Sequence, residues 1–454
     1  MVNHKLFRKD TAKDASIGEY LQQAIDIEIS TIPTYLYTYY SINRTPTQEL
    51  LCAQIINQLM SNNEKQLING TPVLTLQEAT KKAQDLSAQI MVLANKAGAM
   101  IMSVAIEEML HVSLSSNIMQ ALVGNPILNG RTPMVWPAEL PGHEPKLMLN
   151  KTKLSPDQLE AFIAVESPKP LGKKNIKTAI PYYTIGEFYH EILRILEKDF
   201  KKDSDYNTTR PQLVPGKGYY SANTIDTVYY NREHNPSVVS REDSGDIIHV
   251  TNFDSAKKAI QEICEQGEGN EADQHKTDDK SRQELSHWEK FKLLHKSLTE
   301  HITIFENEGL DLLSYFVLNV PTNPKTSEYP AHIQAVSNLV NGVYTYIFVM
   351  IEACYAPAVQ NTQYEIFMMG IHKSMIFILN SLCGDINGMT YTDANGDQKI
   401  AAATFETYPF GGPSSPKSQL IALYNTAVAV YPKISYLGGR INDLPSVPLN
   451  NYNK

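Results

Sequence analysis

The sequence predicts an all-α protein built around a four-helix bundle, with an irregular insertion and an additional helical region toward the C-terminus. Long stretches repeat apolar residues at alternating spacings of three and four, which is the period of one buried helix face. Within several of these apolar stripes a glutamate or histidine stands where an apolar residue is expected. Only residues 246–250 resemble a strand. The pattern therefore favours helices throughout, with polar side chains placed inside the bundle.

Composition narrows the class of protein. The chain has 454 residues, 42% of them hydrophobic and 20% charged, which suits a globular protein with a large core and more than one domain. A formal net charge of −9 argues against nucleic-acid binding. There is no uninterrupted apolar run of about twenty residues and no apolar core of a secretory signal near the N-terminus, so we expect no membrane span. Four scattered cysteines without a CxxC pair predict reduced thiols in a cytoplasmic protein.

The first half of the chain supplies two long predicted bundle helices. Residues 17–43 form the first, and residues 47–68 and 75–122 continue as helices. Gly124-Asn125-Pro126 is a helix-stop signal. The segment 126–180 is rich in proline and is expected to be an irregular insertion.

The rest of the bundle is predicted in pieces. Residues 183–200 form the third bundle helix, and the polar stretch 201–250 is a second insertion. Helical pattern resumes at 255–265, and a charged, Gly-containing insertion at 266–282 separates it from a helix at 281–308. These boundaries predict a bundle domain over 1–308 and a C-terminal helical region over 309–454. That region contains two long apolar helices within 330–385 and a further helix ending near 430.

Glu108-Met-Leu-His111 is the most informative motif. The helical stripe that contains it comprises Ile101, Val104, Glu108, His111, Ser115, Ile118 and Leu122. Burying a carboxylate and an imidazole is costly unless another group compensates them. A metal ion can do so, and Glu-x-x-His on a core-facing helix is the ligand arrangement of carboxylate-bridged two-metal bundles.

Matching residues occur on the other predicted helices. Glu28 lies in the middle of the first apolar stripe, and Glu187 lies in the third helix. Glu284-x-x-His287 repeats the motif on an apolar face of the last helix. Two-metal bundles need about four carboxylates and two imidazoles from four helices, and this inventory fits. The sequence contains no GxSxG elbow, phosphate-binding loop, dinucleotide fingerprint or HExxH motif.

Some of these assignments have simpler alternatives. Any single glutamate or histidine on a helix is more often solvated or hydrogen-bonded in a core than bound to a metal. Periodicity alone predicts that Glu187 and His190 lie on a solvated face. Glu107 lies off the stripe of its helix, so we interpret it as a surface residue or as an outer hydrogen-bonding partner of a ligand.

Several blocks of the chain resemble the ferritin-like family of iminophenyl-pyruvate dimer synthases, of the violacein, rebeccamycin and staurosporine pathway type. The blocks are AIDIEISTIPTYLYTYYSI (24–42), AIEEMLHVSLSSNIMQALVGNP (105–126), TIGEFYHEI (184–192), ICEQGEG (263–269) and LSHWEKF (285–291). The resemblance extends over about 15–305 and implies a ferritin-like bundle.

The resemblance also implies a ligand set. It assigns metal-binding and catalytic roles to Glu28, Glu108, His111, Glu187 and His287. For the remaining carboxylate it favours Glu265, whereas periodicity favours Glu284. An insertion between Glu265 and His287, within the fourth helix, would reconcile the two readings. We expect Glu265 to be the ligand and keep Glu284 as the alternative.

The functional expectation is an oxidoreductase with two iron ions, or manganese in their place. With oxygen or peroxide it would oxidise or oxidatively couple a small aromatic imine or amine derived from an amino acid, in secondary metabolism. Histidine nitrogen and carboxylate oxygen suit these metals. The alternatives are a non-enzymatic iron-binding or ferroxidase-like protein, and a structural ferritin-like protein. Tyr35, Tyr37 and Tyr39 follow Glu28 closely and are candidates to line a pocket, to relay an electron or simply to pack the core.

Overall fold

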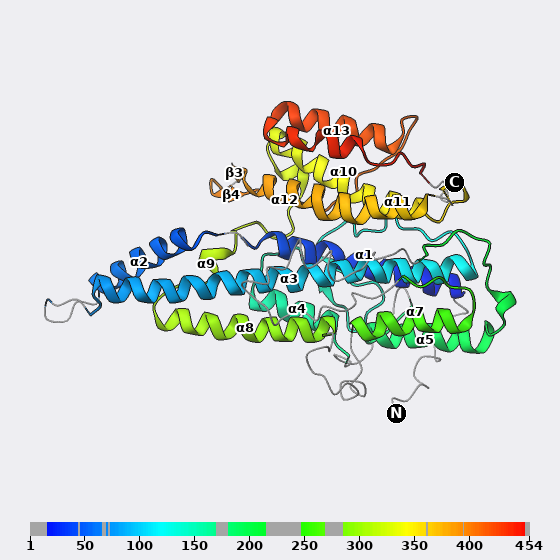
Figure 1. Cartoon of the computed structure of the whole chain (residues 1–454), viewed down its shortest axis with the longest axis horizontal. Helices are drawn as coiled ribbons and strands as arrows, with labels where there is room; N and C mark the ends of the chain where they lie inside the picture. Colours follow the sequence, from blue (N-terminus) through cyan, green and yellow to red (C-terminus); the bar gives the residue numbers. More distant parts are fainter. Residues whose placement is uncertain are drawn as a thin grey trace.

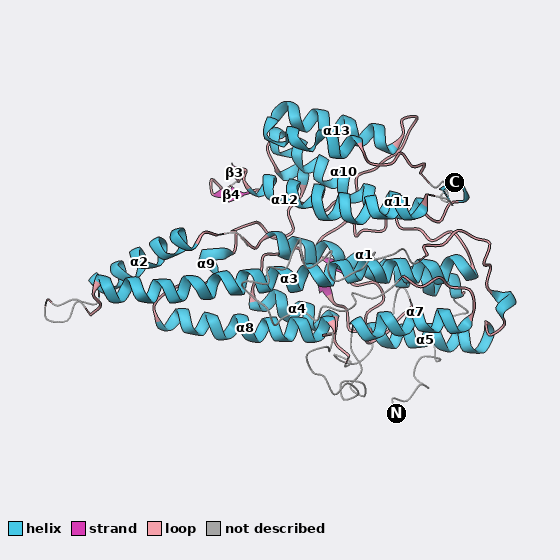
Figure 2. Cartoon of the chain, in the orientation of Figure 1, coloured by secondary structure: helices cyan, strands magenta, loops and turns pink. Residues whose placement is uncertain are grey.

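Helices are the main secondary structure of the described residues and strands are few and short, which confirms the all-α prediction (Figure 2). The computed structural model describes residues 16–43, 46–65, 70, 73–168, 180–214, 247–267, 285–359, 362–393 and 395–449. Its named strands are two short antiparallel pairs, β1 (Ala138–Glu139) with β2 (Met148–Leu149) and β3 (Thr390–Thr392) with β4 (Gln398–Ile400).

Two antiparallel helices form the spine of the bundle. α1 (Ile17–Tyr40) packs along α3 (Leu76–Leu122), and α2 (Gln48–Lys65) also packs against α3 (Figure 1). A capping box between Thr75 and Glu78 begins α3. Its end coincides with the predicted stop signal, because Gly124 takes a left-handed conformation, φ +94°, that glycine adopts without steric cost.

Each of the other two helix positions of the four-helix bundle is occupied by two shorter helices, one after the other. α4 (Pro156–Val165) packs against α8 (His287–Asn307), and α5 (Ile185–Asp199) packs against α7 (Phe253–Gly267). Figure 1 shows α8 and α7 following one another along α3. Four helix ends therefore meet near the middle of the bundle.

Helix α4 corrects one expectation. The segment 126–180 was predicted to be irregular, but within it Ser155 caps a regular helix that has Pro156 in its first turn. Serine followed by proline is a recognised start signal for a helix, so the signal was present in the sequence. Most of the predicted insertion 201–250 and nearly all of 266–282 lie outside the described residues.

The last bundle helix begins later than predicted. Residues 281–284 lie outside the described residues, Leu285 and Ser286 are not helical, and α8 begins at His287. Ser286 is its N-cap and forms a capping box with Glu289. His287 is therefore the first residue of the helix rather than a residue in its second turn.

The C-terminal helices form a layer over α1 (Figure 1). The Asn387 amide donates to the Tyr40 carbonyl, and the rings of Tyr40 and Phe405 stack, so the layer shares its core with the bundle. Its main helices are α10 (Ala331–Ala353), α11 (Gln363–Met368), a π-helix (Met369–Leu379), α12 (Asn380–Asn387), α13 (Pro416–Val430) and α14 (Gly438–Asn442). The short helix α9 (Leu313–Phe316) lies beside α3 in the bundle instead.

Two helical stretches are long and apolar enough to cross a membrane, judged by length and composition alone. They are α3 and the continuous stretch Gln363–Asn387. In their most apolar windows 72% and 65% of the residues are buried inside the protein. Core helices of a bundle give the same signal, so the finding is weak evidence for a membrane span.

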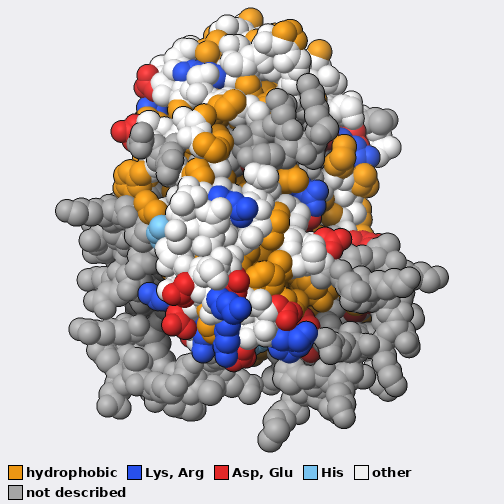
Figure 3. Space-filling model, turned by 90° about the vertical axis from the view of Figure 1, so that its right-hand side faces the viewer, with side chains coloured by type: hydrophobic (Ala, Val, Ile, Leu, Met, Phe, Trp, Pro, Cys, Tyr) orange, Lys and Arg blue, Asp and Glu red, His pale blue; other side chains and the backbone are white. Residues whose placement is uncertain are grey.

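Side chains of both charges lie together on the end face of the bundle. Figure 3 views the molecule from the right of Figure 1, and Lys and Arg are interspersed with Asp and Glu on the lower visible part of that face. Hydrophobic side chains are scattered above them.

We expect Gly342→Leu to destabilise the C-terminal layer. A Cβ atom at Gly342 in α10 would lie 2.6 Å from Leu423 Cδ1 and 3.3 Å from Leu420 Cδ1 of α13. A larger side chain must therefore push α13 away, at a cost of about 1–3 kcal/mol. Urea denaturation measures the loss. The matched control is Gly384→Leu in α12, where a Cβ meets nothing within 4 Å. An equal loss in both variants would contradict the packing argument.

Candidate metal centre

Three carboxylates and two imidazoles meet in the middle of the bundle, where α4 and α7 end and α5 and α8 begin. Glu28 comes from α1, Glu108 and His111 from α3, Glu166 from the residue that ends α4, and His287 from the start of α8. None is more than 3% exposed. Each lies on or beside a helix whose apolar face packs into the bundle, so the fold carries these polar groups into the core.

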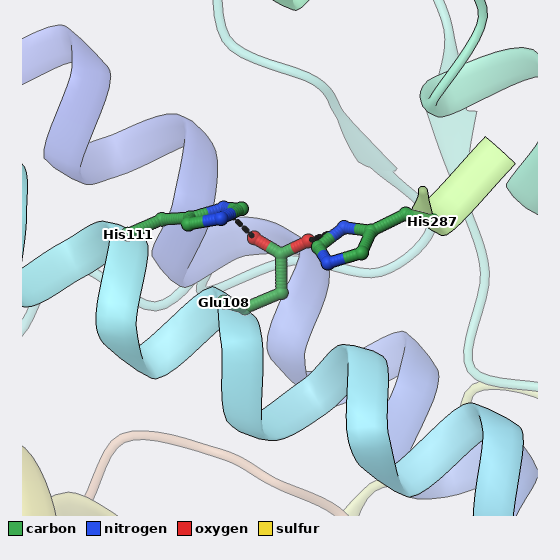
Figure 4. A group of neighbouring side chains, drawn as sticks. All are labelled: Glu108, His111 and His287. Carbon is green, nitrogen blue, oxygen red and sulfur yellow. Dashed lines mark ion pairs between the residues drawn. The ribbon is translucent and has the colours of Figure 1, made fainter. Parts of the chain in front are cut away.

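Glu108 lies between two similar half-sites (Figure 4). One oxygen, Oε2, is 3.7 Å from His111 Nδ1, and the other, Oε1, is 3.1 Å from His287 Nδ1. His111 Nδ1 also lies 3.7 Å from Glu28 Oε2, while His287 Nδ1 lies 3.6 Å from Glu166 Oε2. Each half-site thus contains one imidazole, one carboxylate of its own and one oxygen of Glu108.

The Nε2 atom of His287, on the side of the ring away from Glu108, contacts the ion pair of Glu107 and Lys290. His287 Nε2 is 2.9 Å from Glu107 Oε2, and the Lys290 ammonium is 2.7 and 2.5 Å from the two Glu107 oxygens. Burial alone would raise the pKa of Glu107, but Lys290 and then His287 outweigh it and lower that pKa to about 2. Glu107 is therefore an ionised acceptor, and His287 Nε2 must donate its hydrogen. Nδ1 is left facing Glu108 and Glu166.

The far nitrogen of His111 is held by an amide instead. The Gln266 amide nitrogen donates to Glu262 at 3.2 Å, which turns Gln266 Oε1 toward His111 Nε2 at 3.0 Å. His111 Nε2 therefore donates, and its Nδ1 faces the carboxylates. Burial opposes the charged imidazolium, yet Glu108 and Glu28 raise the pKa of His111 to about 10 in the metal-free protein.

A tyrosine hydroxyl supports each outer carboxylate. Tyr189 donates to Glu28 Oε1 at 2.5 Å and lies 2.9 Å from the Ser115 hydroxyl. Tyr35 donates to Glu166. Burial, followed by the neighbouring carboxylates, raises the pKa of both phenols well above the ordinary value, so both remain hydrogen-bond donors.

The centre fits a bound cation. Glu108 Oε2 and His287 Nδ1 are buried atoms without a hydrogen-bond partner, although other polar groups surround them. Burial, then Glu28 and Glu166, raises the pKa of Glu108 to about 7, because like charges crowd the site. Both Nδ1 atoms point at carboxylates, and the ligand atoms of Glu108, His111 and His287 lie within 4.8 Å of one another. A positive ion would satisfy the orphaned atoms and relieve the crowding.

A small cavity of about 10 Å³ adjoins the centre. That is room for about one water molecule. Its polar wall is Glu28, Glu108, His111 and Glu166, and the opposite wall comes from the start of α5 and the end of α7: Ile185, Gly186, Tyr189, Ile263, Cys264 and Gly267.

The structure brings four of the sequence-predicted residues together, namely Glu28, Glu108, His111 and His287. It does not bring Glu187 to the centre, because the Glu187 carboxylate accepts from the Tyr183 backbone N–H at the start of α5. Glu265 is exposed, and its buried neighbour Gln266 faces His111. Glu284 lies outside the described residues.

Glu166 was missed by the sequence reasoning. It follows α4, whose start signal Ser155-Pro156 would have revealed a helix with the glutamate directly after it. Glu107, interpreted as a surface or outer residue, is an outer residue and is buried. Tyr35 contacts the centre through Glu166, whereas Tyr37 donates to the Pro321 carbonyl away from it.

We expect Ser286→Ala to loosen the start of α8. Loss of the N-cap costs about 1 kcal/mol and frays the turn that carries His287. Thermal unfolding should show the loss, and divalent metal binding should weaken. Thr75→Ala removes the equivalent cap of α3, far along the chain from the centre, so it should cost similar stability without weakening metal binding. Unchanged metal binding in the Ser286 variant would contradict this role.

Comparison with known proteins gives one family match. A family model described as Ferritin-like matches residues 21–296, which contain all five clustered residues. No curated protein matches the sequence. Among solved structures, a ferritin-like protein from Caulobacter vibrioides is 18% identical, with a TM-score of 0.40, over 78% of this chain and 93% of that chain.

Proposed function

Because the chain belongs to the ferritin-like family, we propose that it is an oxidoreductase that holds two iron or manganese ions and uses oxygen or peroxide. The observation that carries the proposal is the position of Glu108, whose two oxygens face two different imidazoles. Glu28 with His111 would hold one ion, Glu166 with His287 the other, and Glu108 would bridge them. When bound, a pair of redox-active ions supplies the electrons that reduction of oxygen or peroxide requires.

The protein's own groups prepare this site. Tyr189 and Tyr35 keep one oxygen of Glu28 and Glu166 hydrogen-bonded, which limits how far each carboxylate can swing. Glu107 and Gln266 hold the two imidazole rings with their Nδ1 atoms inward. Three carboxylates against two divalent ions leave one positive charge, which favours an anionic small ligand in the adjoining cavity.

The organic substrate belongs to the same proposal. We propose an aromatic imine or amine derived from an amino acid, oxidised or oxidatively coupled in the cytoplasm. Support comes from the resemblance of five sequence blocks to the iminophenyl-pyruvate dimer synthases. Ile185 and Ile263 give the cavity beside the centre an apolar wall. All four cysteines are free thiols, in keeping with a reducing compartment.

A second candidate function is the oxidation of iron itself. The cavity of about 10 Å³ accommodates a water-sized ligand but no aromatic ring, and this observation favours a ferroxidase-like role. In that case reduced iron is the substrate and no organic molecule is turned over.

Metal content tests the centre. The native protein and the double variant Glu108→Ala with His111→Ala are loaded anaerobically with Fe²⁺, desalted and assayed for iron, and oxygen is then added while absorbance is followed. We expect about two irons per native chain with an oxygen-dependent absorbance change, and neither in the variant. Equal iron loading in both would overturn the proposal.

Turnover separates the two candidate functions. Aromatic amino-acid-derived imines and amines are added with oxygen or peroxide, and products are identified by mass spectrometry. Consumption of the organic compound by the native protein, and not by the double variant, supports the oxidoreductase. Oxidation and retention of added iron, with no organic compound consumed, supports the ferroxidase-like role instead.

A further inference from the structure

The two half-sites share three features. Each contains an inward Nδ1 atom, one carboxylate of its own and a supporting tyrosine. They differ in the group behind the imidazole: His287 donates to the carboxylate of Glu107, whereas His111 donates to the amide of Gln266. Glu107 is 3% and Lys290 is 7% exposed, so this difference lies in the core, where solvent screens it little.

A carboxylate and an amide act differently on an imidazole. A hydrogen bond to a carboxylate draws the N–H proton outward and makes the opposite nitrogen a stronger ligand, and an uncharged amide oxygen does this less. Lys290 contacts both Glu107 oxygens, and its positive charge keeps Glu107 ionised despite burial. Among the described residues, the side-chain contacts of Glu107 are with His287 and Lys290, so the effect acts on His287.

The two half-sites also differ in how they adjoin the cavity. His111 lines it together with Glu28, Glu108 and Glu166, whereas His287 does not. An ion at His111 would therefore adjoin this space with all of its ligands, whereas an ion at His287 would face it only through Glu166 and the shared Glu108.

We propose that Glu107 and Lys290 form a positioning pair that makes the two metal positions unequal. The position of His287 and Glu166 binds its ion first and more tightly, and the position of His111 and Glu28 is the exchangeable one beside the cavity. The inference rests on the proposed two-metal centre.

Stepwise cobalt binding tests the inference without any assay of activity. Metal-free protein is titrated with Co²⁺, whose visible absorbance reports each ion as it is bound. We expect two steps of different affinity, the tight one lost in His287→Ala and the weak one lost in His111→Ala. The double variant Glu107→Gln with Lys290→Met removes the pair without leaving an unpaired charge. It should weaken the tight step about 10- to 100-fold and leave the weak step unchanged.

A variant that exchanges two side chains tests the half-site of His111. Glu262→Gln with Gln266→Glu swaps two hydrogen-bonded side chains, keeps the net charge and places a carboxylate behind His111. We expect the weak step to strengthen, and Lys290→Arg, which preserves the charge, to retain the native tight step. Circular dichroism confirms that each variant is folded.

The outcomes are distinguishable. Two ions of equal affinity in the native protein, or equal weakening of both steps in the Glu107 and Lys290 variant, would overturn the inference and leave the two-metal proposal standing. Binding of fewer than two ions by the native protein would overturn the proposed function itself.

Discussion

Glu108→Gln is expected to abolish the binding of both metal ions and, at the same time, to stabilise the metal-free protein. Glutamine cannot bridge two cations as a carboxylate does, so both half-sites lose a ligand. In the metal-free protein, burial and the nearby Glu28 and Glu166 raise the Glu108 pKa from 4.5 to about 7. A raised carboxyl pKa means that the folded state binds this proton more tightly than the unfolded state. The ionised group therefore destabilises the fold, and glutamine removes that penalty.

Because the pKa of Glu108 is higher in the folded than in the unfolded protein, the stability gained through Glu108→Gln depends on pH in a defined direction. Below about pH 4.5 the carboxyl group is protonated in both states, and the variant gains nothing by this route. The gain grows as pH rises from 4.5 to 7 and is constant above, at roughly 1–3 kcal/mol. Urea denaturation of both chelator-treated proteins between pH 4 and 8 measures it, and a metal titration at pH 7.5 follows the loss of binding.

Glu352→Gln is the matched control. Burial raises the pKa of Glu352 to about 7 as well, but this carboxylate accepts from the backbone N–H groups of Leu128 and Asn129, outside the centre. Its replacement should leave metal binding intact. A Glu108 variant that still binds two ions, or whose metal-free form is less stable at pH 8, would refute the argument.

The part of the centre that could be predicted is the part carried by long amphipathic helices. Glu28, Glu108 and His111 lie in stripes many turns long, so a single register satisfies the whole apolar face and fixes where each polar residue points. Periodicity placed Glu187 on a solvated face and favoured Glu284 over Glu265, and the structure leaves Glu187 and Glu265 outside the cluster. The resemblance favoured them instead.

The positions of Gln266 and Glu166 depend on where helices end. Consecutive helical residues point about 100° apart, so the inward position of Gln266 sends Glu265 outward. Glu166 follows a helix of ten residues, too short for a strong periodic signal, and its position comes from packing of α4 against α8. Contacts between segments distant in sequence decide such residues, and periodicity within one segment carries no information about them.

Metal binding is expected to release protons and to strengthen steeply as pH rises. In the metal-free protein Glu108 and Glu28 raise the pKa of His111 to about 10, and Glu107, Glu108 and Glu166 raise that of His287 well above its usual value, in both cases against the effect of burial. Both imidazoles are therefore doubly protonated at neutral pH. Each must lose its Nδ1 proton before that atom can bind a cation. Glu108, with a pKa of about 7, retains part of a third proton.

Calorimetry measures this release directly. Titration of Zn²⁺ into metal-free protein, in buffers of different ionisation enthalpy, should show about two protons released at pH 8.5 and closer to three at pH 6, one from each imidazole and the rest from Glu108. Because each displaced proton changes the overall binding constant about tenfold per pH unit, affinity for the pair of ions should rise about 100-fold between pH 7.5 and 8.5. His295→Asn, a change on α8 outside the cluster, should release the same number. Ions that bind with no proton release would show that the imidazoles are not the ligands, since their Nδ1 atoms cannot hold a proton and a metal ion together.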